Sequence, residues 1–248
     1  MSREPERVEG AGPAAQPTPE AAARRRRREA RRLSRAQVVY ALGLMAFAVL
    51  ALYARTHAYF AWDLRLALAI RSVDVPGWAP FMAWTSVFGD GPVPYVLAGT
   101  TVLAFFFRGR RSEAAALALS TGGGGILENR LKDIIGRPRP PAEMVGCVYD
   151  TDNLSFPSGH VTFYVCYFGF LFFASYALLP RGTRRRRVAL TLSALPVLLI
   201  SVSRVSLCAH WPSDTLGAYL LSGVWLAFCI GLYRRWKQRS TLHPEEGQ

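Results

Sequence analysis

The chain has 248 residues, of which 51% are hydrophobic, and it carries a formal net charge of +13. Its mean hydropathy is positive at +0.15, which is high for a soluble domain, so the composition argues against a soluble fold. The charge does not indicate a nucleic-acid partner, because the basic residues gather in short segments between apolar stretches. We therefore expect an integral membrane protein.

Residues 1–36 are rich in Pro, Ala, Glu and Arg and predict a disordered basic tail. Six stretches follow, most of them near the length that crosses a hydrocarbon core of about 30 Å. They cover residues 38–54, 80–107 (interrupted by "GDGPVP"), 113–135, 159–179, 188–205 and 212–233. The expected fold class is all-α, a polytopic bundle of six transmembrane helices over residues 37–236, with a short tail at 237–248.

Two segments are ambiguous. Residues 58–74 are too short and too charged to span, and they predict an interfacial helix with Tyr59 and Trp62 as aromatic anchors. The stretch 113–135 carries glutamates, an asparagine and four consecutive glycines. This stretch could form an amphipathic surface helix instead of a span, although small residues also let transmembrane helices pack closely.

The arginine clusters predict the topology. They precede the first stretch ("ARRRRREARRLSR") and follow the second ("RGRR"), the fourth ("RGTRRRR") and the sixth ("RRWKQR"). The positive-inside rule then places both termini in the cytoplasm and three loops on the far side. We expect a multi-pass protein of the inner (plasma) membrane, whose far-side loops face the periplasm or the cell exterior.

The four cysteines give little information about fold or function. Cys166 and Cys229 lie within predicted spans, whereas Cys147 and Cys208 fall in or near the far-side loops. An oxidising compartment would permit a bridge between the latter two, with free thiols as the simpler expectation. The sequence does not decide whether they pair.

Three short stretches carry the polar residues that a membrane segment does not need. They are "KDIIGRPRP" at 132–140, "FPSGH" at 156–160 and "SRVSLCAHWPSD" at 203–214. All three fall on the far side of a topology that was drawn without them. A charge at the bilayer centre costs about 2.5–3.5 kcal/mol, so their gathering at one face predicts a functional site.

The residue types indicate an anion site. Ser158, Gly159 and His160 open the fourth span, and a helix N-terminus offers free N–H groups and partial positive charge. Gly159 lets the backbone approach the anion closely. Three cationic side chains suited to phosphate oxygens join them: Lys132, Arg139 and Arg204. We found no spacing typical of magnesium or zinc sites, so no cofactor is expected and protein charge alone would hold the anion.

The two remaining histidines suggest the chemistry. His210 and Asp214 are four residues apart, so the carboxylate can accept the imidazole N–H and leave the other ring nitrogen as a nucleophile. His160 has no carboxylate four residues on and is better suited to give a proton to a leaving oxygen. Taken singly, a histidine at a helix end or a snorkelling arginine is ordinary. Their joint occurrence on one face is what favours a site.

These residues resemble the tripartite signature of the type 2 phosphatidic acid phosphatase family. The resemblance rests on Lys132 with Arg139–Pro140, on "PSGH" at 157–160, and on Ser203–Arg204 followed by His210 and Asp214. It covers about residues 80–230, the expected catalytic core, and the family is similar in its core to vanadium haloperoxidases. The six expected spans disfavour that soluble branch.

The resemblance implies a role for each matching position. The phosphoryl group would be bound by Lys132, Arg139, Ser158, Gly159 and Arg204. His210 would attack phosphorus to form a phosphohistidine, and Asp214 would orient His210. His160 would protonate the leaving group and then activate water, with no metal required.

The expected activity is dephosphorylation of a membrane lipid phosphate or pyrophosphate. Phosphatidic acid, phosphatidylglycerol phosphate, undecaprenyl pyrophosphate and the 1-phosphate of lipid A are all compatible with the sequence. A lipid-linked phosphotransferase that uses the same intermediate, and a non-enzymatic protein that binds or transports anionic lipid, stay open. The sequence does not indicate the oligomeric state or the source organism.

Overall fold

The computed structural model describes residues 19–147 and 154–242, and all regular structure within these ranges is helical. The chain divides into two compact units, Met1–Ala41 and Leu42–Gln248. The first α-helix, α1, begins in the first unit and continues into the second. Every other described helix belongs to the second unit, which contains all three polar stretches.

The helices follow the predicted stretches closely, which confirms the all-α class. In chain order they are α1 (Pro19–Thr56), α2 (Ala61–Arg71), α3 (Trp78–Ser86), the 3₁₀ turn η1 (Val87–Gly89), α4 (Val93–Phe107), α5 (Arg111–Ile135), α6 (Ala142–Val145), α7 (Gly159–Leu178), α8 (Arg184–Ser206) and α9 (Pro212–Leu242). The short helix α6 was not predicted; it lies in the loop that follows α5.

Four helices of the described chain are long and apolar enough to cross a membrane. They contain the segments Gln37–Thr56, Gly159–Leu178, Arg184–Ser206 and Pro212–Gln238. A fifth span results if Trp78–Gly89 and Val93–Phe107 are taken together, with a bend of 54° between them at the predicted "GDGPVP" break. The polar helix α5 does not meet these criteria, so the count of six spans stays a prediction.

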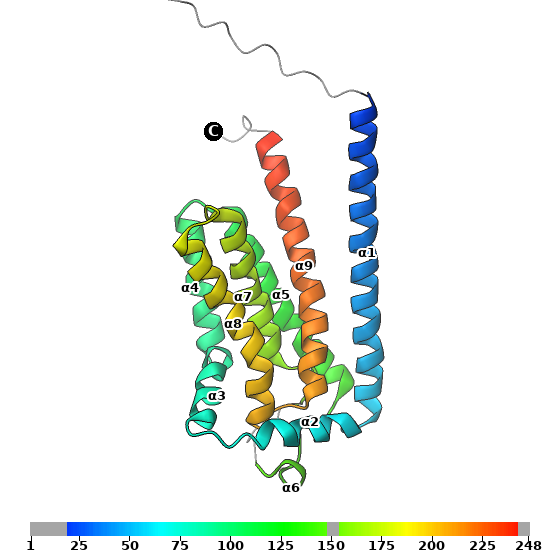
Figure 1. Ribbon diagram of the computed structural model, residues 1–248, viewed down its shortest axis with the longest axis vertical. Helices are drawn as coiled ribbons and strands as arrows, with labels where there is room; N and C mark the ends of the chain where they lie inside the picture. Colours follow the sequence, from blue (N-terminus) through cyan, green and yellow to red (C-terminus); the bar gives the residue numbers. More distant parts are fainter. Residues whose placement is uncertain (1–18, 148–153, 243–248) are drawn as a thin grey trace, which may run out of the picture. The chain divides into compact units, whose positions relative to one another are not determined.

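Helix α7 forms the centre of the bundle. It packs against α5, α8 and α9, and α4 and α5 lie beside each other (Figure 1). A helix that is apolar on all sides is suited to burial rather than to one exposed face. Its side chains Tyr164, Tyr167, Phe168 and Phe170 accordingly lie in the largest hydrophobic cluster of the described residues.

Helical structure extends into both predicted tails, of which residues 1–36 were expected to be disordered. Residues 19–36 form the first part of α1, because the Ala, Glu and Arg residues of this segment are strong helix formers. Helix α9 likewise continues beyond residue 236 to Leu242. Residues 1–18 and 243–248 of the predicted tails lie outside the described residues.

The predicted helix after the first span is present as α2, and it lies across the ends of α8 and α9 (Figure 1). Trp62 and Tyr59 are both partly exposed, as aromatic anchors at an interface would be. The Tyr59 ring also stacks on Trp211, with 5.4 Å between the ring centroids. Position and aromatic content agree with an interfacial helix, whose contact with lipid stays a prediction.

A disulfide joins Cys147 to Cys208, a pairing that the sequence left undecided. The two Cα atoms lie 6.1 Å apart across 61 residues of sequence, a proximity that local spacing does not encode. The bridge ties the loop after α6 to the turn after α8. Cys166 and Cys229 are free and buried, as predicted for cysteines within spans.

Loss of this bridge should lower stability. We expect Cys147→Ser and Cys208→Ser each to reduce the free energy of unfolding by about 2–4 kcal/mol, because a covalent loop restricts the unfolded chain. The measurement is thermal unfolding in detergent, with and without a reductant. The double variant should have the same melting temperature as the single variants, and the reductant should not change it. If the double variant instead lost as much stability as both single variants together, the assignment of the bridge would be contradicted.

Candidate active site

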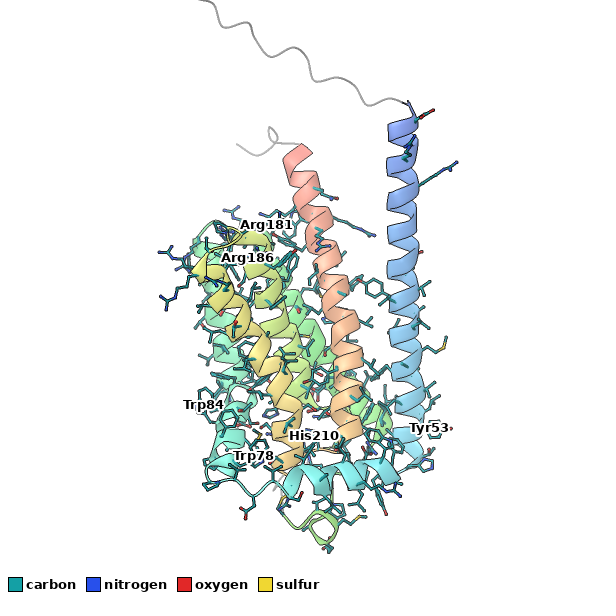
Figure 2. All side chains as sticks on the ribbon, viewed as in Figure 1. Tyr53, Trp78, Trp84, Arg181, Arg186 and His210 are labelled. Carbon is teal, nitrogen blue, oxygen red and sulfur yellow. A yellow bond between two sulfur atoms is a disulfide. The ribbon has the colours of Figure 1, made fainter. Side chains whose placement is uncertain are left out.

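The three polar stretches meet at one end of the bundle, where α5 and α8 end and α7 and α9 begin. Figure 2 shows His210 at this end, and Arg181 and Arg186 at the opposite end of the helices. The predicted gathering of the motif residues is therefore present. The arginines of the loop between α7 and α8 lie away from it.

His210 lies in the short connection between α8 and α9 and is buried. Its Nδ1 is 3.7 Å from Asp214 Oδ2, which is longer than a hydrogen bond. The Ser155 hydroxyl lies 3.5 Å from Nδ1 and donates to the same carboxylate oxygen. The expected direct bond is replaced by this arrangement because α9 begins at Pro212, so only part of the four-residue interval is helical.

The environment keeps the His210 imidazole neutral. Burial lowers the pKa of His210 well below its usual range, and the positive charges of Arg139, Arg204 and Lys132 act in the same direction. At neutral pH the ring therefore has one nitrogen with a free lone pair. Since Nδ1 faces the Asp214 side, this nitrogen is Nε2, which lies 3.4 Å from Arg139 Nη1.

The three predicted cations are held by their own neighbours. Lys132 Nζ pairs with Glu128 Oε1 at 2.5 Å, one turn back on α5. Arg204, buried at the end of α8, donates to the Ser86 hydroxyl at 2.5 Å. Arg139 donates to the carbonyl oxygen of Ala209 at 2.5 Å, next to His210 in the chain.

The start of α7 offers groups suited to an anion. Ser158 is the N-cap residue and fully buried, and within the described chain its hydroxyl has no hydrogen-bond partner. A Cβ on Gly159 would lie 2.9 Å from Glu128 Oε1, so the close approach of α5 favours glycine there. A buried hydroxyl without a partner is costly, and an oxyanion ligand would satisfy it.

A cleft of about 520 Å³ opens beside these groups. Lys132, Gly159 and His160 line it at the end of the bundle, and it continues between α4, α5 and α7 past glycines and apolar side chains. Part of the predicted anion site and a channel with both polar and apolar lining therefore share one opening.

Arg137 is a site residue that the sequence motifs did not predict. It is fully buried and donates to Asp214 Oδ1 at 2.6 Å, to Asp63 Oδ2 at 2.9 Å and to the Ser213 hydroxyl at 2.6 Å. Asp63 also accepts the backbone N–H of Ser213 at 2.8 Å. Arg137 thus links α2 to the first turn of α9, which carries Asp214.

Weak signals for the missed residues do exist. Arg137 stands two positions before Arg139 in the same proline-rich stretch, and Asp63 is the only carboxylate of α2, "AWDLRLALAIR". Asp90 comes from "GDGPVP", and its Oδ1 lies 2.8 Å from His160 Nε2. Ser155 opens the "SFPSGH" stretch. In each case the residue type was visible, but its partner was distant in sequence.

Comparisons with known proteins identify the family of the chain. The family model described as the PAP2 superfamily matches residues 113–238. Phosphatidylglycerophosphatase B of Bacillus subtilis (strain 168) is 28% identical over 126 residues, which cover 51% of this chain and 60% of that relative. All three polar motifs lie inside the matched range, whereas Asp63 and Asp90 lie before it.

A solved structure is similar in fold. The crystal structure of the first transmembrane PAP2-type phosphatidylglycerolphosphate phosphatase from Bacillus subtilis superposes with a TM-score of 0.66. The superposition covers 79% of this chain and 96% of that one, at 22% sequence identity. The likeness extends the shared fold beyond the range of the family model.

The buried link through Arg137 should be important for stability. We expect Asp63→Asn to destabilise the protein by about 3–5 kcal/mol, because it leaves the Arg137 guanidinium buried with one of its two carboxylates removed. Thermal unfolding in detergent measures the loss. The matched control is Asp74→Asn, which changes an exposed carboxylate soon after the same helix. Equal melting of the two variants would count against the role of Asp63.

Proposed function

Because the chain belongs to the PAP2 superfamily, we propose that it hydrolyses the phosphate of a membrane lipid phosphate or pyrophosphate. The observation that carries the proposal is the set of three cations around a buried, neutral His210. Phosphoryl transfer depends mainly on positioning and on charge stabilisation, and both are available in such a site.

We propose that the substrate phosphate occupies the space between the cations and the start of α7. Its ligands would be Lys132, Arg139, Arg204, the Ser158 hydroxyl and the Gly159 backbone N–H. The buried Ser158 hydroxyl supports this proposal because it has no other partner in the described chain. The guanidinium groups would neutralise the oxygens as charge develops in the transition state.

In the first step, His210 Nε2 would attack phosphorus. The P–N bond forms while the P–O bond to the lipid breaks, and His160 gives its proton to the leaving oxygen. In the second step, His160 takes a proton from water as the water oxygen bonds to phosphorus. The P–N bond then breaks and inorganic phosphate leaves. Asp214, with Ser155, would keep the His210 ring in place.

The substrate class follows from the cleft and from the relatives. The cleft runs from the proposed phosphate site between α4, α5 and α7, and apolar side chains such as Ala98 and Phe163 line part of it, which suits an amphiphile with a phosphate head. The curated relative and the solved structure are both named as phosphatidylglycerophosphate phosphatases of Bacillus subtilis, so phosphatidylglycerol phosphate is the first substrate to test. Phosphatidic acid, undecaprenyl pyrophosphate and lipid A 1-phosphate remain in the same class.

We propose that α5 is the sixth span. Its 25 residues extend about 37 Å, enough to cross a bilayer. The acidic and hydroxyl residues Glu113, Ser120 and Glu128 are buried in the bundle. The apolar residues Leu119, Ile126 and Ile134 are exposed, as a lipid-facing side would be. Low mean hydropathy here reflects an inward polar face.

We propose that the site faces the periplasm or the cell exterior. Arg181, in the loop after α7, and Arg186, in the first turn of α8, lie at the opposite end of the bundle, which the positive-inside rule assigns to the cytoplasm (Figure 2). The Cys147–Cys208 disulfide lies at the site end, and disulfides persist in oxidising compartments. Two independent features thus favour the same orientation.

The decisive test is phosphate release by the detergent-purified protein with a chelator present. We expect wild type to release inorganic phosphate from at least one of the four lipids, and His210→Ala to be slower by at least about a thousandfold, because the nucleophile is gone. His57→Ala, which changes an exposed histidine at the end of α1, is the matched control.

The outcomes separate the alternatives. Release by wild type and by His57→Ala, but not by His210→Ala, supports the phosphatase. Release that appears only when a lipid or sugar acceptor is added would instead indicate a phosphotransferase. No turnover by the folded wild type under either condition would refute the enzymatic proposal.

The four consecutive glycines of α5 divide into two pairs. A Cβ on Gly123 would lie 2.3 Å from the Trp225 ring, and one on Gly124 would lie 2.7 Å from the Cys166 sulfur. This pair allows close helix packing. Gly122 and Gly125 line the cleft, and a Cβ added at either position would have nothing within 4 Å. We propose that the second pair keeps the channel open for an acyl chain.

Filling the channel should discriminate against long lipids. Gly125 and Gly122 lie about 10 Å and about 15 Å along the helix from Lys132, within reach of a long acyl chain. We expect Gly122→Leu to lower kcat/KM about tenfold for a long-chain lipid phosphate and less than about twofold for a short-chain analogue. Gly99→Leu, at an exposed helical glycine outside the cleft, is the control. Equal losses on both substrates would contradict the channel.

A further inference from the structure

The turn between η1 and α4 contacts the histidine proposed as the general acid. Its backbone is tight: the N–H of Asp90 donates to the Val87 carbonyl at 3.2 Å, and the N–H of Val93 donates to the Asp90 carbonyl at 3.1 Å. Gly91 has a φ of 51°, a left-handed conformation that favours glycine. This geometry fixes the direction in which the Asp90 side chain leaves the turn.

The turn holds the His160 ring from two directions. Asp90 Oδ1 lies 2.8 Å from His160 Nε2, a hydrogen-bonding distance. A Cβ on Gly89 would lie 2.3 Å from His160 Cδ2, so the ring rests directly against the backbone of that residue. A side chain at Gly89 would displace the ring. The "GDG" break in the second span is therefore shaped around His160.

A carboxylate at this distance determines which ring nitrogen carries the proton. A carboxylate only accepts hydrogen bonds, so Nε2 must be protonated when it faces Asp90. Nδ1 is then the nitrogen left to exchange a proton with a ligand. His210 has the complementary arrangement, with Nδ1 toward the Asp214 carboxylate and Nε2 toward Arg139.

We propose that Asp90 is a positioning residue that keeps the proton of His160 on Nε2, so that Nδ1 transfers the proton in both steps. The inference rests on the proposed phosphatase function. In the first step the Nδ1 proton moves to the leaving oxygen, which keeps the electron pair of the broken P–O bond. In the second step Nδ1 takes a proton from the attacking water as the P–N bond breaks.

The charges around the ring explain why a carboxylate is needed. While Nδ1 holds a proton for the leaving oxygen, the ring is a cation. The other charged or titratable groups near it are Lys132 with its partner Glu128, Arg204 and His210. Lys132 and Arg204 repel the cationic ring, whereas the carboxylate of Asp90 stabilises it.

Asp90 is also a favourable residue to substitute. The side chain of Asp90 is 47% exposed, whereas that of His160 is 15% exposed. The hydrogen bond described for the Asp90 carboxylate is the one to the His160 ring. Asp90→Asn keeps the size of the side chain while it removes the charge. Residues 87–93 lie before the range matched by the family model, so the contact is a feature that this match does not assign.

The test compares two substrates with different leaving groups. Aryl phosphates such as p-nitrophenyl phosphate release a stable phenolate and need little proton transfer, whereas a lipid alkoxide needs the acid. For the lipid phosphate that wild type hydrolyses, we expect Asp90→Asn to lower kcat at least about tenfold with KM within about twofold. For the aryl phosphate, kcat/KM should stay within about twofold, because it reports only the steps through P–O cleavage.

The other outcomes are equally informative. An equal fall of kcat/KM on both substrates would mean that Asp90 has a structural role, and a raised lipid KM with unchanged kcat would make it a head-group contact; either result overturns the proposal. Asp74→Asn should match wild type on both substrates. The aryl phosphate reaction also shows that the variant is folded. A wild type inactive on both substrates would refute the phosphatase itself, a failure distinct from that of Asp90.

Discussion

The fully buried guanidinium of Arg137 is the contact on which the geometry of the site depends. It joins Asp63 of α2 to Asp214 of α9, and both carboxylates are inaccessible to solvent. Removing charges from water is costly, and a buried pair persists only when its geometry and hydrogen bonds are nearly complete. Here the fork of Arg137 is complete, because its Nε also donates to the carbonyl of Ala58 at 3.1 Å. The site is therefore fixed from outside the motif residues, by a helix that crosses the end of the bundle.

The same principle explains how several cations can lie close together at this end of the bundle. Each of the three cationic side chains predicted to bind phosphate is held by a neighbour: Lys132 pairs with Glu128, and Arg204 and Arg139 donate hydrogen bonds to Ser86 and to the Ala209 carbonyl. The positive charges of these three side chains act on the nearby His210. Together with burial they lower its pKa, and we propose that they also attract the substrate phosphate. One set of cations would thus prepare both the proposed nucleophile and the proposed anion site.

The sequence predicted the features that depend on local pattern. Apolar length identified the helices, and residue type identified the cations and the two histidines. The contacts of Asp63, Asp90 and Ser155 were not predictable, because each joins residues that are distant along the chain. The disulfide was not predictable for the same reason, since Cys147 and Cys208 are brought together by the fold. Residues 19–36 were misjudged for a different reason: charge and proline content suggested disorder, while the Ala, Glu and Arg residues favour helix.

The two histidines show how much a long-range contact adds to a motif. A spacing of four residues suggested that His210 had a carboxylate and that His160 had none, and this difference, together with the family resemblance, suggested their roles. In the folded chain each ring has a carboxylate on one side, but on opposite nitrogens: Nδ1 of His210 is directed toward Asp214, and Nε2 of His160 toward Asp90. The two rings therefore differ in which nitrogen is free, and in surroundings, since His210 is held among arginines. The separate roles that we propose for them rest on this geometry and not on the presence or absence of an acidic partner.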